Sequence, residues 1–452
     1  MGPVEREVSS TSLSTANPAV ARLFINTDDG VEIEVNQTEQ RECSLAASAE
    51  VRDFYERMPY PAPLTSLDEY RALYSNPDRR RALFHLLWPT ERLRENREIL
   101  IAGCGTSQAA KYALREPNAR VTAIDISERS LSNTRLLQQK HSLGNLELRQ
   151  LSLLNVQELG QSFDQIVCTG VLHHLPDPEL GLRALRDVLK PEGAMQIMVY
   201  ATYGRTGIYM MQAYCRQLGI TPSRQELQDL RTALNDLPED HPLTNLLRKG
   251  KDFQNLDALA DALLHPQDRS YTVPQVYEWL DRCGMSFGRW FEQAPYLPQC
   301  GVLAKTPHAD RLAALPEPDQ HAAVELFRGT ITQHNFVAYR SDRSTESQAI
   351  RFTDQQWRKY IPIRLPWTEC VRDRGPAGSV AVLLNRAHKH RDLVLPINAA
   401  QSRLFNEIDG TRSLDEIVRN DGKEDARSLQ FFERLWQYDQ IGFDASCAAA
   451  AG

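Results

Sequence analysis

A short loop that contains two glycines, and an acidic residue 20 positions after it, are the features of this sequence best suited to bind a ligand. Gly103 and Gly105 directly follow an apolar segment, and Asp125 ends the next apolar segment. Glycine permits a tight turn at such a place and lets backbone N–H groups approach a bound molecule closely. A carboxylate at the end of the second strand can accept hydrogen bonds from two ribose hydroxyls. The spacing therefore predicts a nucleoside-binding site.

The residues around the loop distinguish two classes of nucleoside cofactor. A dinucleotide site has a third glycine three positions after the second, and this sequence has Gln108 there, which counts against NAD. S-adenosylmethionine has no pyrophosphate to hold, so that third glycine is dispensable. The loop therefore favours S-adenosylmethionine over a dinucleotide.

Four segments, in order over about 100 residues, resemble the class I S-adenosylmethionine-dependent methyltransferases. They are residues 99–106 (ILIAGCGT), 121–127 (VTAIDIS), 163–175 (FDQIVCTGVLHHL) and 189–193 (LKPEG). The resemblance implies an α/β fold with a Rossmann-like methyltransferase sheet. It also implies an enzyme that uses S-adenosyl-L-methionine as its cofactor, with no metal ion.

The resemblance assigns a set of residues to the cofactor. They are Tyr55, Gly103, Cys104, Gly105, Asp125, Ile126, Ser152, Leu153, Thr169 and Gly170. The loop after the third strand would hold the adenine, and the loop after the fourth strand would meet the methionine end. Ile101 and Ser152 stand where the family often has acidic residues, so adenine recognition falls to the Leu153 backbone and the Ser152 hydroxyl.

Candidate catalytic residues follow the fourth and fifth predicted strands. They are His173, Tyr200 and Asp268, together with Tyr60 from the segment before the sheet. The His173–His174 pair has two interpretations: one ring packs on the sheet or over the cofactor, or one acts as a general base. Residues 169–172 are Thr-Gly-Val-Leu instead of the Asn-Pro-Pro-Tyr of the family's amide- and base-methylating branch, which disfavours methylation of a planar nitrogen.

Two further segments each have a functional and a structural interpretation. Tyr55 and residues 59–61 either close over the cofactor, where aromatic faces suit a sulfonium cation, or end a helix and cover the core. Residues 265–272 (HPQDRSYT) form either a substrate-pocket wall or a surface loop with an Asp268–Arg269 pair. Ligands bind at the carboxyl edge of open α/β sheets, and the pocket interpretation places this second segment over that edge.

The elements that must position these residues alternate between strands and helices from residue 98 onward. Apolar strands are predicted at 98–102, 120–124, 145–150, 163–168 and 194–200, and such alternation indicates a parallel sheet covered on both faces. We predict a loose N-terminus with a small hairpin at 1–45 and a methyltransferase domain at 46–305, which includes a helical insertion at 204–295. A mixed linker and regulatory region follows at 306–394 and starts with a linker at 306–320. The chain then has a winged-helix-like domain at 395–452.

Composition argues against several classes of protein. The 452 residues include 52 Lys and Arg and 59 Asp and Glu, a net charge of -7, and residues 395–446 have 6 basic against 10 acidic residues. Phosphate binding needs the opposite sign, so no DNA partner is expected. No apolar run approaches 18 residues, so no membrane insertion is expected. The eight dispersed cysteines lack zinc spacing and indicate free thiols in a cytoplasmic protein.

The chain as a whole resembles a longer group that includes the rickettsial-type outer-membrane-protein lysine methyltransferases. The resemblance rests on Tyr60-Pro61, on residues 265–271 and on the C-terminal winged-helix-like region. It implies that the methyl acceptor is a lysine amine of a protein partner. Two alternatives stay open: a small-molecule methyltransferase, and a catalytically silent protein that binds S-adenosylmethionine or a partner. The sequence leaves the oligomeric state open.

Overall fold

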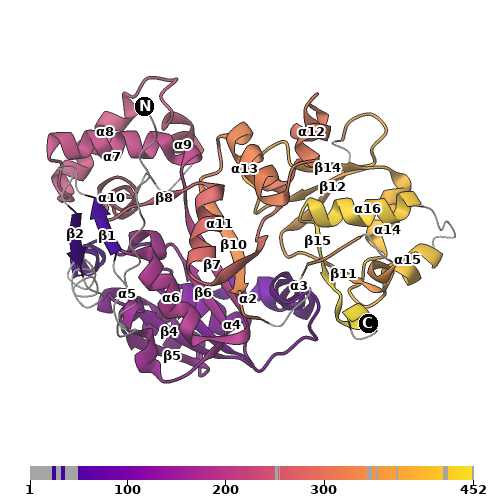
Figure 1. Cartoon of the computed structure of the whole chain (residues 1–452), viewed down its shortest axis with the longest axis horizontal. Helices are drawn as coiled ribbons and strands as arrows, with labels where there is room; N and C mark the ends of the chain where they lie inside the picture. Colours follow the sequence, from indigo (N-terminus) through magenta and orange to yellow (C-terminus); the bar gives the residue numbers. More distant parts are fainter. Residues whose placement is uncertain are drawn as a thin grey trace, which may run out of the picture. The chain divides into compact units, whose positions relative to one another are not determined.

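The computed structural model describes residues 23–26, 32–35, 49–249, 253, 255–343, 349–352, 355–372, 375–420 and 426–449 (Figure 1). Residues 1–50 and 51–452 form two units. In the first unit, β1 (Leu23–Asn26) pairs antiparallel with β2 (Glu32–Val35), so the expected hairpin is present. The rest of the predicted loose segment at 1–45 lies outside the described residues.

A sheet of mostly parallel strands forms the centre of the second unit. Its long strands are β3 (Glu98–Ala102), β4 (Arg120–Asp125), β5 (Leu146–Gln150), β6 (Phe163–Thr169), β7 (Leu189–Ala201), β9 (Met285–Trp290) and β10 (Gln333–Arg340). The order is β5-β4-β3-β6-β7-β10-β9, and the short β8 (Ser270–Tyr271) pairs with β7. The first five strands of this order are parallel, whereas β10 runs antiparallel to both of its neighbours. This arrangement brings the carboxyl ends of five strands to one edge.

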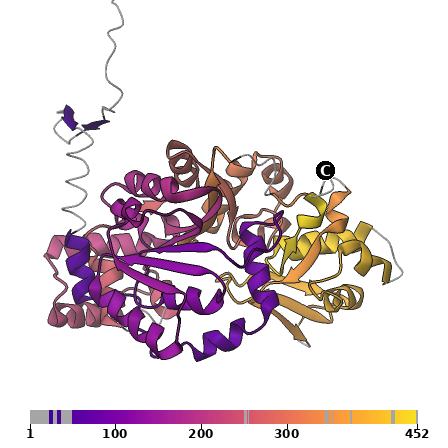
Figure 2. The same cartoon turned by 90° about the horizontal axis from the view of Figure 1, so that it is seen from below.

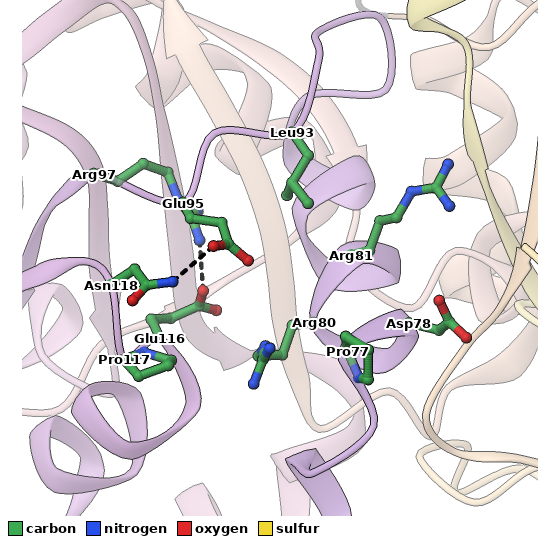
Figure 3. Close-up of a pocket in the computed structure, with 10 residues that line it drawn as sticks. All are labelled: Pro77, Asp78, Arg80, Arg81, Leu93, Glu95, Arg97, Glu116, Pro117 and Asn118. Atoms are coloured by element: carbon green, nitrogen blue, oxygen red, sulfur yellow. Dashed lines mark hydrogen bonds and ion pairs between the residues drawn. The ribbon is translucent and has the colours of Figure 1, made fainter. Parts of the chain in front are cut away.

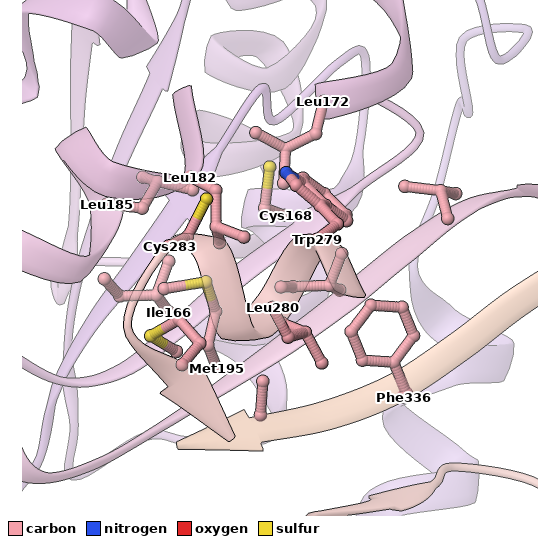
Figure 4. Packing of buried hydrophobic residues seen from close by; sticks show 14 of the residues in the cluster. Ile166, Cys168, Leu172, Leu182, Leu185, Met195, Trp279, Leu280, Cys283 and Phe336 are labelled. Atoms are coloured by element: carbon pink, nitrogen blue, oxygen red, sulfur yellow. The ribbon is translucent and has the colours of Figure 1, made fainter. Parts of the chain in front are cut away.

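Helices cover both faces of the sheet because successive side chains of its buried strands point to opposite faces. From β3, Leu100 packs into one core cluster with Trp279, whereas Ile99 and Ile101 pack into a second cluster. Figure 4 shows the first cluster, where side chains of the strands meet those of the covering helices. The helices are α6 (Pro178–Val188) and α11 (Val273–Arg282) in the first cluster, and α4 (Gln108–Arg115) and α5 (Glu128–His141) in the second.

A group of helices between β7 and β8 forms a separate small core. Phe54, from the helix at residues 49–57, is buried there with Leu227 and Leu259. The insertion therefore packs against the segment that precedes the sheet, which brings Tyr55 to the carboxyl edge. The inserted helices are α7 (Thr206–Leu218), α8 (Arg224–Asn235), α9 (Thr244–Lys249) and α10 (Leu256–Leu264).

The middle of the chain agrees with the sequence prediction in one range and differs in another. The range 204–295 is mainly helical, and it also holds β8 and β9. The range 306–320 is not a linker, because α12 (Ala309–Ala313) lies inside it and α13 (Glu317–Arg328) begins there. Strand β10 lies beyond residue 305, where we predicted the methyltransferase domain to end, and it fills the position between β7 and β9. The sheet is therefore incomplete without residues 333–340.

The C-terminal residues form a core of their own. Three helices precede a strand there, as expected, and that strand, β15 (Ile441–Asp444), pairs antiparallel with β11 (Ile361–Arg364). A further sheet has the order β12-β13-β14. The assignment of residues 395–452 to the winged-helix class stays a prediction. The remaining elements are β12 (Thr368–Arg372), β13 (Ala381–Asn385), β14 (Val394–Ile397), α14 (Ala399–Asn406), α15 (Leu414–Asn420), α16 (Ala426–Gln437) and α17 (Ser446–Ala449).

Helix α3 (Pro77–Leu87), which follows α2 (Asp68–Tyr74), lies between the sheet and the C-terminal residues (Figures 1 and 2). Arg81 Nη2 lies 2.7 Å from Asp444 Oδ2 at the end of β15. On the opposite side of α3, Tyr339 of β10 donates its hydroxyl proton to the Leu87 carbonyl, at 2.5 Å. The helix therefore connects the sheet with the C-terminal part through buried contacts.

Candidate active site

The glycine loop after β3 has a backbone conformation that requires glycine at two positions. Gly103 and Gly105 have φ of +72° and +54°, in the left-handed region that favours glycine. A Cβ at Gly103 would lie 2.3 Å from Val171 Cγ2, so a larger residue does not fit there. The Cys104 side chain is buried, and its N–H donates to the Ile124 carbonyl at 3.0 Å. The predicted loop is therefore present, with the Cys104 thiol directed into the core.

Asp125, at the end of β4, is fixed by the loop it faces. Its Oδ2 accepts the Gly105 N–H at 2.8 Å, and its Oδ1 accepts the Ser127 N–H at 2.9 Å. Burial raises the pKa of Asp125 to about 6, although these backbone N–H groups oppose the shift. Ile126 follows, half-buried, and its carbonyl accepts from Gln150 Nε2 at 3.1 Å. Further hydrogen-bond donors would stabilise the ionised carboxylate.

The segment before the sheet crosses the glycine loop. Thr106 donates its hydroxyl proton to the Pro61 carbonyl at 2.7 Å. The atoms nearest to a Cβ built on Gly105 are Pro61 Cδ, at 3.4 Å, and the Tyr60 carbonyl oxygen, at 3.5 Å. The backbone of Tyr60 and Pro61 therefore lies against the glycine loop, and the closure of this segment over a cofactor stays a prediction.

The loops after β5 and β6 complete the same edge. Ser152 caps the 3-10 helix at 153–159, its hydroxyl accepting from the Leu154 N–H at 3.4 Å, and the Leu153 side chain is buried. Thr169 Oγ1 accepts from Gln108 Nε2 at 2.7 Å, and Gly170 has φ of +76°. Gln108, the residue that replaces the third glycine of a dinucleotide site, thus ties the glycine loop to the loop after β6. Sequence reasoning noted Gln108 only as an absence of glycine.

A cluster of polar side chains lies beyond the ends of β6 and β7, and we call it the polar cluster. The ring centroids of His173 and Tyr200 are 4.1 Å apart, and those of His174 and His265 are 3.8 Å apart. The sequence predicted His173, Tyr200 and Asp268, and the structure brings all three into this cluster. Its members are Tyr55, His173, His174, Tyr200, Arg205, Asp261, His265 and Asp268.

Asp268 is held by two elements of the insertion. Its Oδ2 accepts from Gln212 Nε2 at 2.8 Å and lies 3.7 Å from Arg205 Nη2. The Arg205 guanidinium lies 3.5 Å from the centroid of the Tyr200 ring, a cation–π contact. The alternative interpretation, a surface pair between Asp268 and Arg269, is therefore wrong, because the Asp268 side chain is 4% exposed and pairs with Arg205.

Asp261 is a member of the polar cluster that sequence reasoning missed. It lies on α10 and is 3% exposed, and its Oδ1 accepts the Tyr55 hydroxyl proton at 3.0 Å. Its signal in the sequence is the second of two acidic residues, after Asp257, inside the otherwise apolar run 256–264 (LDALADALL). Burial raises the pKa of Asp261. An exposed helix would have given the same local pattern, so only the fold identifies this residue.

Several buried atoms of the polar cluster lack a hydrogen-bond partner within the described protein. Leaving such an atom unsatisfied costs about 1–3 kcal/mol. They therefore mark the place where a bound molecule could add hydrogen bonds. The atoms are both ring nitrogens of His173, His265 Nε2, Asp268 Oδ1, and Nε and Nη2 of Arg205.

Burial sets the protonation of the rings in the polar cluster. It lowers the pKa of His173 and of His265 well below the usual value, and the neighbouring His174 lowers both further. Both imidazoles are therefore neutral near pH 7. Burial, with the charge of Asp261, raises the pKa of Tyr55 and of Tyr200 well above the usual value, so both phenols keep their protons. Tyr60 is near enough to contribute to the shift at Tyr200.

The His and Asp side chains of the polar cluster form two groups of possible ligand atoms, and two of the histidines already bond to the Gln267 backbone. His174 Nδ1 bonds to the Gln267 carbonyl at 2.6 Å, and His265 Nδ1 accepts the Gln267 N–H at 3.1 Å, which leaves the proton of His265 on Nε2. Two groups of side chains have ligating atoms within 4.8 Å of one another: His173, His174 and Asp268, and His174, Asp261 and His265.

A pocket lies at the opposite edge of the sheet (Figure 3). Arg97, just before β3, lines it and bonds to Glu116 after α4, with Nη2 and Oε2 2.7 Å apart. None of the predicted cofactor or catalytic residues lines this pocket. The candidate active site is therefore the carboxyl edge, where the glycine loop, Asp125 and the polar cluster meet.

The strand order and the position of the site match the class I methyltransferase fold. Five parallel strands are followed by β10, inserted antiparallel between β7 and β9, and the glycine loop and Asp125 follow the first two strands of the fold. Residues 100–195 match the family described as a methyltransferase domain. The chain thus carries a methyltransferase domain of the class that uses S-adenosylmethionine, and the class predicted from the sequence is confirmed.

Solved structures and curated sequences add particular relatives. PKMT2 from Rickettsia typhi has a TM-score of 0.56 with this chain at 15% identity, over 82% of this chain and 75% of that chain. The structure of PKMT2 in complex with AdoHcy has the same TM-score at 16% identity, over 81% and 73%. At this identity the likeness concerns the fold.

Two curated relatives match parts of the chain. An uncharacterized protein of Synechococcus sp. is 33% identical over 251 residues, 54% of this chain and 60% of that protein. A ubiquinone biosynthesis O-methyltransferase of Neisseria meningitidis is 31% identical over 101 residues, 22% of this chain and 41% of that protein. The chain thus spans less than two thirds of the length of either relative.

Two expectations from composition concern the chain outside the site. None of the described helices has both the length and the apolar character needed to cross a membrane. The seven cysteines within the described residues have free thiols, and five of them are buried. Cys43 lies outside the described residues.

Proposed function

We propose that this protein transfers the methyl group of S-adenosylmethionine to the side-chain amine of a lysine in a protein substrate. The observation that carries the proposal is the polar cluster beside the glycine loop, where two buried carboxylates, Asp261 and Asp268, stand among tyrosine and histidine rings. Carboxylates and aromatic faces are the groups that attract an alkylammonium. The resemblance to the rickettsial-type lysine methyltransferases supports the same acceptor.

The residues assigned to the cofactor suit S-adenosylmethionine. In the proposed complex, Asp125 accepts hydrogen bonds from the two ribose hydroxyls, and the open loop from Gly103 to Gly105 admits the cofactor close to the backbone. Thr169 and Gly170 contact the methionine end, and the Ser152–Leu153 backbone meets the adenine. Tyr55 and Tyr60 cover the site from the preceding segment.

The chemistry needs positioning and a neutral nucleophile more than a strong acid or base. The cofactor supplies an electrophilic methyl group on a sulfonium for in-line displacement. The chain must hold the amine in line with that methyl group and remove its proton before attack. His173 is the candidate base, because its imidazole is neutral and both of its nitrogens are unpartnered within the described protein. Tyr200, Tyr60 and Asp268 form the walls that orient the amine.

A small-molecule acceptor is the second candidate. The match to a ubiquinone biosynthesis O-methyltransferase favours it, although that match covers only 22% of this chain. The neutral His173 would serve a hydroxyl acceptor as well as an amine. Residues 395–446 carry a net negative charge, which supports a lysine acceptor because negatively charged regions attract basic protein substrates. We propose that this region docks the protein substrate.

A label-transfer experiment separates these candidates. Purified protein is incubated with a lysate and S-adenosylmethionine that carries a tritiated methyl group, and the protein, RNA and small-molecule fractions are counted. The proposal expects label in the protein fraction. Label confined to small molecules would support the second candidate, and absence of label despite measurable cofactor binding would indicate a catalytically silent protein.

A further inference from the structure

We infer that Asp261 is the residue that selects a positively charged alkylamine as the acceptor, by forming an ion pair with its ammonium group. The inference rests on the proposed amine methylation and names a residue for it. Asp261 accepts a hydrogen bond from Tyr55, which belongs to the proposed covering segment. Its charge also acts on Tyr200, which belongs to the predicted acceptor wall.

Asp261 is an exception among the buried acidic residues that the structure describes. Asp268, whose side chain is 4% exposed, pairs with Arg205 at 3.7 Å. Five further buried acidic residues each pair with a nitrogen of Lys, Arg or His within 4.0 Å. The pairs are Glu116 with Arg97 at 2.7 Å, Asp164 with Lys190 at 2.8 Å, Glu325 with His334 at 3.2 Å, Asp439 with His388 at 2.9 Å, and Asp444 with Arg81 at 2.7 Å. Asp261 is 3% exposed and bonds to the neutral hydroxyl of Tyr55.

Nearby cations of the protein do not take the place of that partner. Arg205 pairs with Asp268 at 3.7 Å and stacks on Tyr200. His174, whose ligating atom lies within 4.8 Å of one of Asp261, bonds through Nδ1 to the Gln267 carbonyl at 2.6 Å. His265 stays neutral because burial lowers its pKa. A buried carboxylate without a cation is costly, so a cationic ligand would be bound strongly at this place.

The surroundings of Asp261 match the size and chemistry of an ammonium group. The ligating atoms of His174, Asp261 and His265 lie within 4.8 Å of one another. Two hydrogen bonds of about 2.8 Å at a tetrahedral angle span about 4.6 Å, so one nitrogen can bridge such a pair. His174 donates from Nδ1 to the Gln267 carbonyl at 2.6 Å, which fixes the orientation of its ring beside Asp261.

Aromatic rings surround the same place. The Tyr55 ring centroid lies 5.5 Å from that of His265 and 6.5 Å from that of His174. Ring faces attract a cation that has lost its water, and they exclude a carboxylate or phosphate acceptor. The geometry thus favours a primary or secondary amine at the end of an alkyl chain.

Binding of two small probes tests this inference without the unknown substrate. The full-length protein, saturated with S-adenosylhomocysteine, is titrated with n-butylammonium and with 1-butanol, its neutral counterpart with the same number of non-hydrogen atoms, and binding is followed by NMR. We expect the wild-type protein to prefer n-butylammonium by about tenfold or more, as for a hydrogen-bonded charge pair. Equal affinity for the two probes would overturn the inference.

Variants make the test specific to Asp261. Asp261→Asn keeps the shape and should reduce n-butylammonium affinity about tenfold while S-adenosylhomocysteine affinity stays within about twofold. Asp261→Glu should retain part of the preference, and Asp240→Asn, an exposed carboxylate of the same insertion, should behave as wild type. If Asp261→Asn binds n-butylammonium as tightly as wild type, the inference fails. The proposed function fails separately, if labelled protein does not appear in the lysate experiment.

Discussion

At the scale of single residues, the cofactor site depends on local features and the acceptor site on distant ones. Gly103, Gly105 and Asp125 lie within 23 residues of one another, and the hydrogen bond from Gly105 to Asp125 follows from two adjacent parallel strands. Asp261 and Tyr55 are separated by 206 residues. Spacing in the sequence can reveal the first arrangement, whereas only the tertiary fold brings the second pair together.

The ribose carboxylate gives the first prediction. Replacing Asp125 by alanine removes the proposed acceptor for two ribose hydroxyls and should weaken S-adenosylhomocysteine binding by about 1.5–3 kcal/mol. Isothermal titration calorimetry at pH 7.5, above the pKa of about 6 of this carboxyl, measures the change. Glu128→Gln, an exposed change three residues away, serves as the control. Unchanged affinity in Asp125→Ala would remove this residue from the cofactor site.

The close approach at Gly103 gives the second prediction. Gly103→Ala should destabilise the fold by about 1–3 kcal/mol, because the φ of +72° is unfavourable and the new Cβ would meet Val171. Val171→Ala in the same chain should restore part of the stability by relieving the contact but not the backbone strain. Urea unfolding measures both variants. If Gly103→Ala unfolds at the wild-type urea concentration, the loop does not have this conformation.

At the scale of elements, the sequence predicts the strands that form continuous apolar runs, but it does not predict strand β10, which comes much later in the chain. The strands that hold the cofactor motifs are consecutive and buried on both faces, so each leaves a continuous apolar run. Strand β10 begins 132 positions after the end of β7 and follows two helices, yet it pairs with β7 in the sheet. No local sequence pattern reveals this pairing. This distance explains why the predicted boundary at residue 305 divides the sheet.

Truncation tests the place of β10. A fragment of residues 46–305 lacks the strand between β7 and β9 and should fail to unfold cooperatively, because Phe336, Val337 and Ala338 leave the core. A fragment of residues 46–343 keeps the complete sheet and should bind S-adenosylhomocysteine better than the shorter one. Circular dichroism during heating and calorimetry compare the two. Equal stability and binding of the fragments would show that β10 is dispensable.

At the scale of the whole molecule, the C-terminal part is joined to the sheet by buried charge pairs. Arg289 of β9 lies 3.4 Å from Asp439, and Asp439 accepts the Ala294 N–H at 2.9 Å. Breaking such buried pairs costs about 3–5 kcal/mol, so the two parts should unfold together. The sequence predicted the helices of this region, but pairs that connect residues 150 positions apart leave no local signal.

Buried histidines predict how stability depends on pH. Burial lowers the pKa of His321 to about 4, below its usual value near 6.5. The unfolded chain therefore binds a proton at this residue below about pH 6.5 while the folded chain does not, so stability should fall as the pH drops from 6.5 to about 4. Urea unfolding between pH 7.5 and 4.5 should show a shallower fall for His321→Gln. The same slope in both proteins would contradict a buried neutral His321.

The most direct test of the account is the chemical identity of the methylated product. The protein is incubated with lysate and S-adenosylmethionine that carries a trideuterated methyl group, and labelled proteins are digested and sequenced by mass spectrometry, with Asp125→Ala as the control. The account predicts trideuteromethyl groups on lysine side chains, absent or strongly reduced with the variant. Label on other side chains or on small molecules alone, with lysines unlabelled, would contradict it.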